Sequence, residues 1–243
     1  MSIIKKIKEL GRLDSYFNKT NRNSYDTLSS LLIHRLFPKG TILPFTPFSL
    51  NPNTILHVIN EIQLNKRRSI IEFGSGISTI VLAKFIKENK IDAQVVAVEE
   101  NESWANYIKA ELKKYDCEKF ASVLHVPLAP CKTKGHTGSW HDVPLLKESI
   151  KGKTFDLMIV DGPGAYEEKE IRYPAAIEMI DYFERDFVIF LDDIRRKGEQ
   201  HIYKKWKQFL ATQGHKVQGD IIDSKVYAVI QCGEGFSTYP MSY

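Results

Sequence analysis

Residues 70–79 are Ile70-Ile71-Glu72-Phe73-Gly74-Ser75-Gly76-Ile77-Ser78-Thr79, an apolar run that ends in a glycine turn and continues into a helical pattern. Glycine lets the backbone turn sharply and approach a ligand closely, and the free N–H groups at a helix start face that ligand. The stretch therefore predicts a strand, a turn and a helix, with a binding site at the turn. A lone GxG also fits an ordinary connection between strand and helix, so the rest of the chain must decide.

Outward from this turn, short apolar runs alternate with amphipathic stretches as far as the C-terminus. Near-continuous apolar, β-branched runs between helices are typical of a parallel sheet covered on both faces, which makes this an α/β protein. The last two runs are predicted to pair antiparallel. The predicted strands are Ser69–Phe73, Gln94–Val98, Ser122–Val126, Phe155–Val160, Phe187–Leu191, Lys216–Ile221 and Val226–Ile230; the predicted helices are Ser78–Glu88, Ser103–Tyr115, Tyr173–Phe183 and Glu199–Gln213.

The N-terminal part of the chain differs in character from this alternating region. Residues 1–66 are expected to form a helical extension, which includes an apolar but proline-broken segment at residues 43–48 that could act as a lid. Residues 67–243 are expected to form the binding domain. The N-terminal helices could cap the site of their own chain or pair two chains as a homodimer.

Composition excludes several classes of protein. The 34 basic and 30 acidic residues give a formal charge of +4, too small and too evenly spread to predict nucleic-acid binding. The cysteines Cys117, Cys131 and Cys232 lie far apart, without the spacing of a zinc site or a disulfide framework. No apolar run approaches the ~18 residues that span a bilayer. We therefore expect a cytoplasmic protein without a transmembrane segment.

An acidic residue ends the second predicted strand. Glu99 lies 23 positions after Gly76, where a carboxylate can accept both hydroxyls of a ribose. Glu72-Phe-Gly-Ser-Gly and Glu99 resemble the cofactor motifs of class I S-adenosylmethionine-dependent methyltransferases, over residues 68 to 231. The resemblance implies a Rossmann-like fold of seven strands in the order 3-2-1-4-5-7-6, with strand seven antiparallel. It also implies cofactor binding by Glu72, Gly74, Ser75, Gly76, Ser78, Thr79, Glu99, Trp104, Pro127, Leu128 and Asp161.

Three more acids follow the fourth and fifth predicted strands. Asp161 ends one strand, and Asp192 and Asp193 end the next, so all three should meet at the sheet edge that carries the glycine turn. The pattern is similar to metal-dependent O-methyltransferases of the catechol and macrolide-sugar types. That resemblance implies a magnesium ion held by Asp161, Asp192 and Asp193, which would lower the pKa of an acceptor hydroxyl. The alternative is that the acids contact cofactor and acceptor without a metal.

The general base is less well indicated. Catechol-type enzymes carry a lysine three residues after the first metal-binding acid, whereas position 164 is Gly. The stretch from Pro127 to Lys153 is expected to be a long functional loop. By residue type, His125, His136, His141 and His201 are candidate bases, and His141, which lies in this loop, is predicted to be catalytic together with Asp161. Arg172 and Arg195 could recognise an anionic or polyhydroxylated acceptor, or could form structural ion pairs.

The predicted reaction is O-methylation of a hydroxyl on a sugar, a glycan or a small natural product. A first alternative is a metal-independent methyltransferase that acts on another nucleophile. A second alternative is a nicotinamide-dependent oxidoreductase. Two features argue against it: Thr79 stands where the GxGxxG motif has its third glycine, and the predicted sheet ends in an antiparallel pair. A non-catalytic adenosyl-binding protein is the third alternative.

Overall fold

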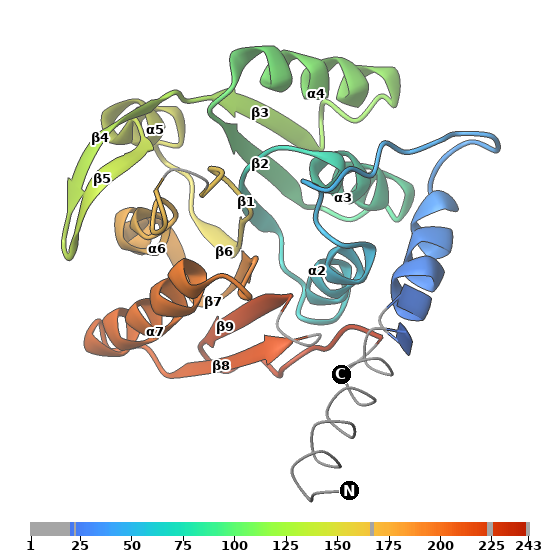
Figure 1. Cartoon of the computed structure of the whole chain (residues 1–243). Helices are drawn as coiled ribbons and strands as arrows, with labels where there is room; N and C mark the ends of the chain where they lie inside the picture. Colours follow the sequence, from blue (N-terminus) through green and yellow to red (C-terminus); the bar gives the residue numbers. More distant parts are fainter. Residues whose placement is uncertain (1–19, 22, 166–167, 223–225, 242–243) are drawn as a thin grey trace, which may run out of the picture.

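The computed structural model describes residues 20–21, 23–165, 168–222 and 226–241 (Figure 1). Its seven-stranded sheet has the order β3-β2-β1-β6-β7-β9-β8, which is the predicted order once the strands of a separate hairpin are set aside. Strand β9 runs antiparallel to both neighbours, as predicted, and the other pairings are parallel. The strands are β1 (Ser69–Phe73), β2 (Gln94–Glu99), β3 (Ala121–His125), β6 (Phe155–Val160), β7 (Phe183–Asp192), β8 (Val217–Ile222) and β9 (Tyr227–Cys232).

Helices cover both faces of this sheet, because successive side chains of each central strand are apolar and point to opposite faces. In β1, Ile70 packs into one apolar cluster and Ile71 into another. Figure 1 shows the two helical layers on either side of the sheet. One layer contains α2 (Pro52–Leu64), α3 (Ile77–Glu88) and α4 (Glu102–Lys114), and the other contains α5 (Val143–Ser149), α6 (Pro174–Glu178) and α7 (Lys197–Thr212).

The register of the parallel strands sets their carboxyl ends level with one another. Phe73 of β1 is paired with Val98 of β2 and with Val160 of β6, and Val160 is paired with Leu191 of β7. Each of these four residues is followed by a residue singled out from the sequence. The register alone therefore places Gly74, Glu99, Asp161 and Asp192 at one edge of the sheet.

Two local predictions were wrong. The expected loop between Pro127 and Lys153 contains a hairpin of β4 (Leu128–Thr133) and β5 (His136–His141), followed by α5. The sequence did not predict this hairpin, because its strands are mostly polar or partly exposed and do not alternate between apolar and polar residues. The helix expected over Tyr173–Phe183 ends early, in a 3-10 turn at Ile180–Tyr182. Phe183 pairs with Phe155 and stacks on Phe187 at 4.1 Å between ring centroids, so it belongs to β7.

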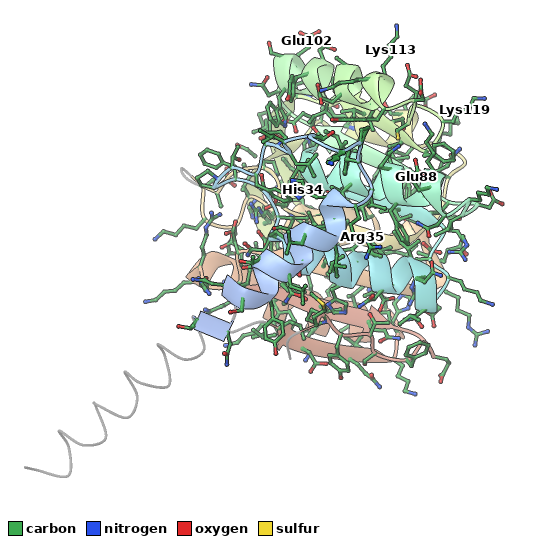
Figure 2. The ribbon with its side chains drawn as sticks, turned by 90° about the vertical axis from the view of Figure 1, so that its right-hand side faces the viewer. His34, Arg35, Glu88, Glu102, Lys113 and Lys119 are labelled. Carbon is green, nitrogen blue, oxygen red and sulfur yellow. The ribbon has the colours of Figure 1, made fainter. Side chains whose placement is uncertain are left out.

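A helical segment at residues 23–34 precedes the sheet and lies against its helical layer (Figure 2, which labels His34 and Arg35). Ile33 and Phe37 are buried in the same apolar cluster as Ile70, and Phe37 meets Tyr115 edge to face at 5.1 Å. The domain division at residue 66 stays a prediction, and the predicted helix before residue 20 lies outside the described residues. Within the described residues, no helix is long and apolar enough to cross a membrane.

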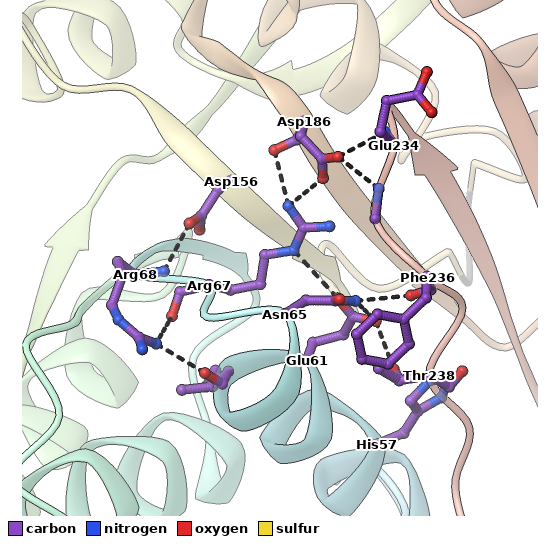
Figure 3. A network of polar contacts seen from close by, with 12 residues as sticks. His57, Glu61, Asn65, Arg67, Arg68, Asp156, Asp186, Glu234, Phe236 and Thr238 are labelled. Carbon is purple, nitrogen blue, oxygen red and sulfur yellow. Dashed lines mark hydrogen bonds and ion pairs between the residues drawn. The ribbon is translucent and has the colours of Figure 1, made fainter.

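A network of buried polar groups ties the C-terminal segment to α2 (Figure 3). Arg67 pairs with Glu61 at 3.2 Å and with Asp186 at 2.6 Å. His57 contacts the Tyr227 hydroxyl through Nδ1 at 2.8 Å and the Thr238 carbonyl through Nε2 at 2.7 Å. Because the carbonyl can only accept, Nε2 carries the proton and Nδ1 accepts from the tyrosine. His57 is thus held in its neutral form.

This geometry predicts an acid-sensitive fold. Burial lowers the pKa of His57 to about 4, whereas the unfolded chain takes up a proton near pH 6.5. The stabilisation that neutral His57 provides is present above pH 6.5 and is lost as the pH falls toward 4, by about 3 kcal/mol in all. In urea unfolding from pH 7.5 to 4, the stability advantage of wild type over His57→Gln should shrink by that amount. An advantage that does not change with pH would contradict the assignment.

Candidate functional site

A cavity of about 420 Å³ opens at the carboxyl edge of the parallel strands. Its lining comes from the ends of β1, β2, β6 and β7, from the start of α4 and from the segment at residues 44–50. The sequence-predicted residues that line it are Gly74, Ser75, Gly76, Ser78, Glu99, Trp104, Asp161, Asp192 and Asp193. One cavity therefore joins the glycine turn to the three acids.

Two loops meet backbone to backbone on the floor of this cavity. Gly74 has φ +94°, a left-handed conformation that favours glycine, and its N–H donates to the Val98 carbonyl at 2.9 Å. The Gly162 N–H donates to the Phe73 carbonyl at 2.7 Å. A Cβ on Gly162 would lie 2.8 Å from the Gly74 Cα, so neither loop has room for a side chain at this point.

Glu72 and Thr79 support the turn from beneath and do not line the cavity. The Thr79 hydroxyl donates to Glu72 Oε2 at 2.5 Å and accepts from the Gly76 N–H at 3.0 Å. Glu72 is fully buried, and burial raises its pKa to about 7. The chain thus ties the end of β1 to the first turn of α3.

Glu99 is held rigidly at the end of β2. Its Oε2 accepts from the backbone N–H and the hydroxyl of Ser75, at 3.0 and 2.9 Å, and its Oε1 accepts from the Asn101 N–H at 3.0 Å. Oε1 keeps one lone pair for a further donor. The neighbouring Glu100 also lines the cavity, and burial together with the Glu99 charge raises its pKa.

Trp104 forms an aromatic wall beside Glu99. Its indole N–H donates to the Ser75 carbonyl at 2.8 Å, and its ring stacks on Tyr107 at 5.1 Å between centroids. Trp104 remains 41% exposed, so one side of the pair is open. The sequence did not single out Tyr107, which faces the same cavity because it lies three residues further along α4.

The three acids converge as the sequence predicted. One oxygen from each of Asp161, Asp192 and Asp193 lies within 4.8 Å of the others. Burial, and then the charges of the other two acids, raises the pKa of Asp192 well above its usual range. Burial also raises the pKa of Asp161, and Arg172 opposes that shift. Asp192 Oδ1 is buried and has no hydrogen-bond partner among the described residues.

Arg172 enters this acidic cluster from below and is only 2% exposed. Its Nε donates to the Pro163 carbonyl at 3.0 Å, and its Nη2 donates to the Asp161 carbonyl. Nη1 lies 3.2 Å from Asp193 Oδ2, and Nη2 lies 3.7 Å from Asp161 Oδ1. A second guanidinium, that of Arg196, contacts the same Asp193 oxygen at 2.9 Å.

These contacts test whether the residues fit a resident divalent cation. Oxygen ligands in this arrangement suit magnesium. However, two of the three carboxylates are already bound by guanidinium groups, one of them buried, and a cation at those oxygens would adjoin a fixed positive charge. As the side chains are arranged, the residues do not fit a resident metal.

Besides Glu72 and Thr79, three predicted residues lie outside the cavity lining. Pro127 and Leu128 lead into the hairpin and do not line the cavity. His141 is fully buried behind Phe73, and its Nδ1 bonds to the Val126 carbonyl at 2.8 Å. Burial lowers the pKa of His141 to about 4. With no access to the cavity, His141 cannot take a proton from a bound acceptor.

Of the two arginines singled out from the sequence, one lies in the cavity lining and the other does not. Arg172 lines the cavity, whereas Arg195 is exposed and its neighbour Arg196 takes the place in the lining. The i, i+3 spacing from Asp193 to Arg196 was the available signal, since a turn brings such residues together.

Comparison with known proteins gives the fold a name. The chain superimposes on a Staphylococcus aureus protein assigned as a caffeoyl-CoA O-methyltransferase, with a TM-score of 0.60, 14% identity and coverage of 88% of this chain and 100% of that one. The chain has a class I methyltransferase fold. A Bacillus cereus O-methyltransferase solved with S-adenosylhomocysteine (SAH) has a TM-score of 0.52 at 16% identity, covering 87% of this chain and 91% of that one. TomG of Streptomyces achromogenes, solved with S-adenosylmethionine (SAM), has a TM-score of 0.53 at 15% identity, covering 87% and 90%. No protein-family model and no curated protein matches the chain.

The contact between the two loops yields a stability prediction. Gly162→Ala should lower the free energy of unfolding by about 1–3 kcal/mol, because its methyl group meets the Gly74 backbone. Gly76→Ala is the control, since a Cβ there meets only the Ser78 hydroxyl, at 3.9 Å, and it should cost less. Urea denaturation measures both. Equal losses would show that the approach of the two loops is not tight.

Proposed function

We propose that this protein is a SAM-dependent methyltransferase that methylates a hydroxyl group on a sugar, a glycan or a small natural product. The observation that carries the proposal is that one cavity contains the glycine turn, the carboxylate of Glu99 at the end of β2, where it could bind a ribose, and the cluster of three aspartates. Neighbours of the same fold, solved with SAH or SAM, support it.

The cofactor would lie across the ends of β1 and β2. Gly74, Ser75 and Gly76 offer close backbone approach, and the start of α3 adds free N–H groups. The remaining lone pair of Glu99 Oε1 would accept a ribose hydroxyl. The exposed side of Trp104 would cover the adenine ring, a role that Pro127 and Leu128 cannot share from outside the cavity.

The acceptor would lie over the ends of β6 and β7. In the reaction a C–O bond forms to the transferred methyl carbon, the C–S bond of the sulfonium breaks, and the hydroxyl proton leaves to a base. The described cavity lining contains no histidine or lysine, so a carboxylate is the available base. We assign this role to Asp161, because its backbone adjoins Gly74 of the glycine turn, where the cofactor would lie. The segment at residues 44–50 would exclude water and align the two substrates.

The cofactor assignment is tested first by calorimetric titration with SAH. Wild type should bind, and Glu99→Ala should weaken binding about 10- to 100-fold, because a hydrogen bond to a charged group contributes about 1.5–3 kcal/mol. Glu118→Ala, at an exposed position outside the cavity, is the matched control and should bind like wild type. Tight binding of reduced nicotinamide in place of SAH would favour the oxidoreductase. If the protein binds neither ligand, the proposal that it is a SAM-dependent enzyme is refuted.

The base assignment is tested by turnover. With an acceptor found by screening sugars and phenols for SAH release, Asp161→Asn should lower kcat by about 10²- to 10⁴-fold, because the amide cannot take the proton. His141→Gln should retain kcat, since His141 lies outside the cavity. If His141→Gln lowered kcat and Asp161→Asn did not, His141 would be the base and Asp161 would not.

A further inference from the structure

The side chain of Arg172 is almost completely buried, with 3% of the side chain exposed, against 16% for the side chain of Asp161 and 30% for that of Asp193. Its guanidinium is fixed from several directions. It holds the backbone carbonyls of Asp161 and Pro163, which follow β6, and the side chain of Asp193, which follows β7. The guanidinium therefore bridges the same two strand ends that a metal ion ligated by Asp161 and Asp193 would bridge.

Charge supports this comparison. The carboxylates of Asp161 and Asp193 are matched by the guanidinium groups of Arg172 and Arg196. The third acid, Asp192, has a buried Oδ1 without a hydrogen-bond partner among the described residues. A cluster built to bind a divalent cation would carry an excess of negative charge for that cation to neutralise. At Asp161 and Asp193, two guanidinium groups already supply the positive charge that such a cation would bring.

We propose that Arg172 replaces the divalent cation of this acidic site, so that the acceptor end works without a metal. The guanidinium holds Asp161 and Asp193 in position to accept hydrogen bonds from the acceptor hydroxyl and its neighbours. The acceptor proton passes to a carboxylate oxygen, and no Lewis acid is needed to remove it. Arg172 is a positioning residue, because it acts through the acids and not on the methyl group.

Replacement of the metal ion by Arg172 can be tested independently of the proposed function, because metal binding can be measured without turnover. The probe is Mn²⁺ alone, added to the full chain after dialysis against EDTA, with free Mn²⁺ followed by electron paramagnetic resonance. Wild type should show no site tighter than about 1 mM. Arg172→Met, which keeps the length of the side chain and removes its charge, should bind Mn²⁺ at least tenfold more tightly than wild type. Adding Asp192→Asn to that variant should abolish the gain.

Two further variants keep the test decisive. Arg195→Met removes an equal charge from the exposed neighbour outside the cavity and should behave like wild type. If Arg172→Met does not fold, as judged by near-UV circular dichroism, Arg196→Ala takes its place. Its side chain is 38% exposed and contacts the same Asp193 oxygen, so it should show a smaller gain in Mn²⁺ affinity.

Wild-type binding of Mn²⁺ below 100 µM that is lost in Asp192→Asn would overturn the proposal, as would a folded Arg172→Met variant that gains no affinity. Failure of SAH binding would remove the proposed function but leave the Mn²⁺ result standing. If SAH binds and an acceptor is found, turnover in EDTA should equal turnover in Mg²⁺, and Arg172→Lys should lower kcat more than it raises the KM for SAM.

Discussion

The backbone contact between Gly74 and Gly162 holds together the two loops that form the floor of the cavity. Parallel strands bring their carboxyl ends to one edge, and the register of β1 with β6 sets those ends level. Only residues without a side chain allow the following loops to touch at that point. Backbone geometry alone therefore makes the glycine turn and Asp161 neighbours, without any side-chain interaction.

Buried arginines organise the two ends of the sheet in different ways. At the end opposite the cavity, Arg67 binds Glu61 and Asp186 and anchors the C-terminal segment (Figure 3). At the cavity, Arg172 ties together the loops after β6 and β7. A buried ion pair adds little net stability compared with apolar packing, but removing one partner leaves an uncompensated charge, which is costly. Both arginines thus specify which loops meet.

Sequence patterns succeeded where the signal was local. The apolar runs ending at Phe73, Val160 and Leu191 predicted central strands, because such strands are buried on both faces and need continuous apolar residues. The hairpin of β4 and β5 gave no such signal, since only part of each strand is buried. His141 was misassigned for a related reason. A histidine in an apparent loop suggests access to solvent, and only the packing of Trp140 and His141 against Phe73 shows that there is none.

By itself the sequence determined the α/β class and the set of acids at the carboxyl edge, and its resemblance to a known family supplied the strand order. The alternation of strands with helices follows from the spacing of apolar residues along the chain, whereas the register of the strands came from the structure. The tertiary structure alone decided what those acids face. Arg172 lies 11 residues beyond Asp161 and precedes α6, and nothing in its spacing indicates that it turns back under Pro163 to reach Asp193. Long-range contacts of this kind depend on how loops fold over the sheet, and the one-dimensional pattern does not encode that.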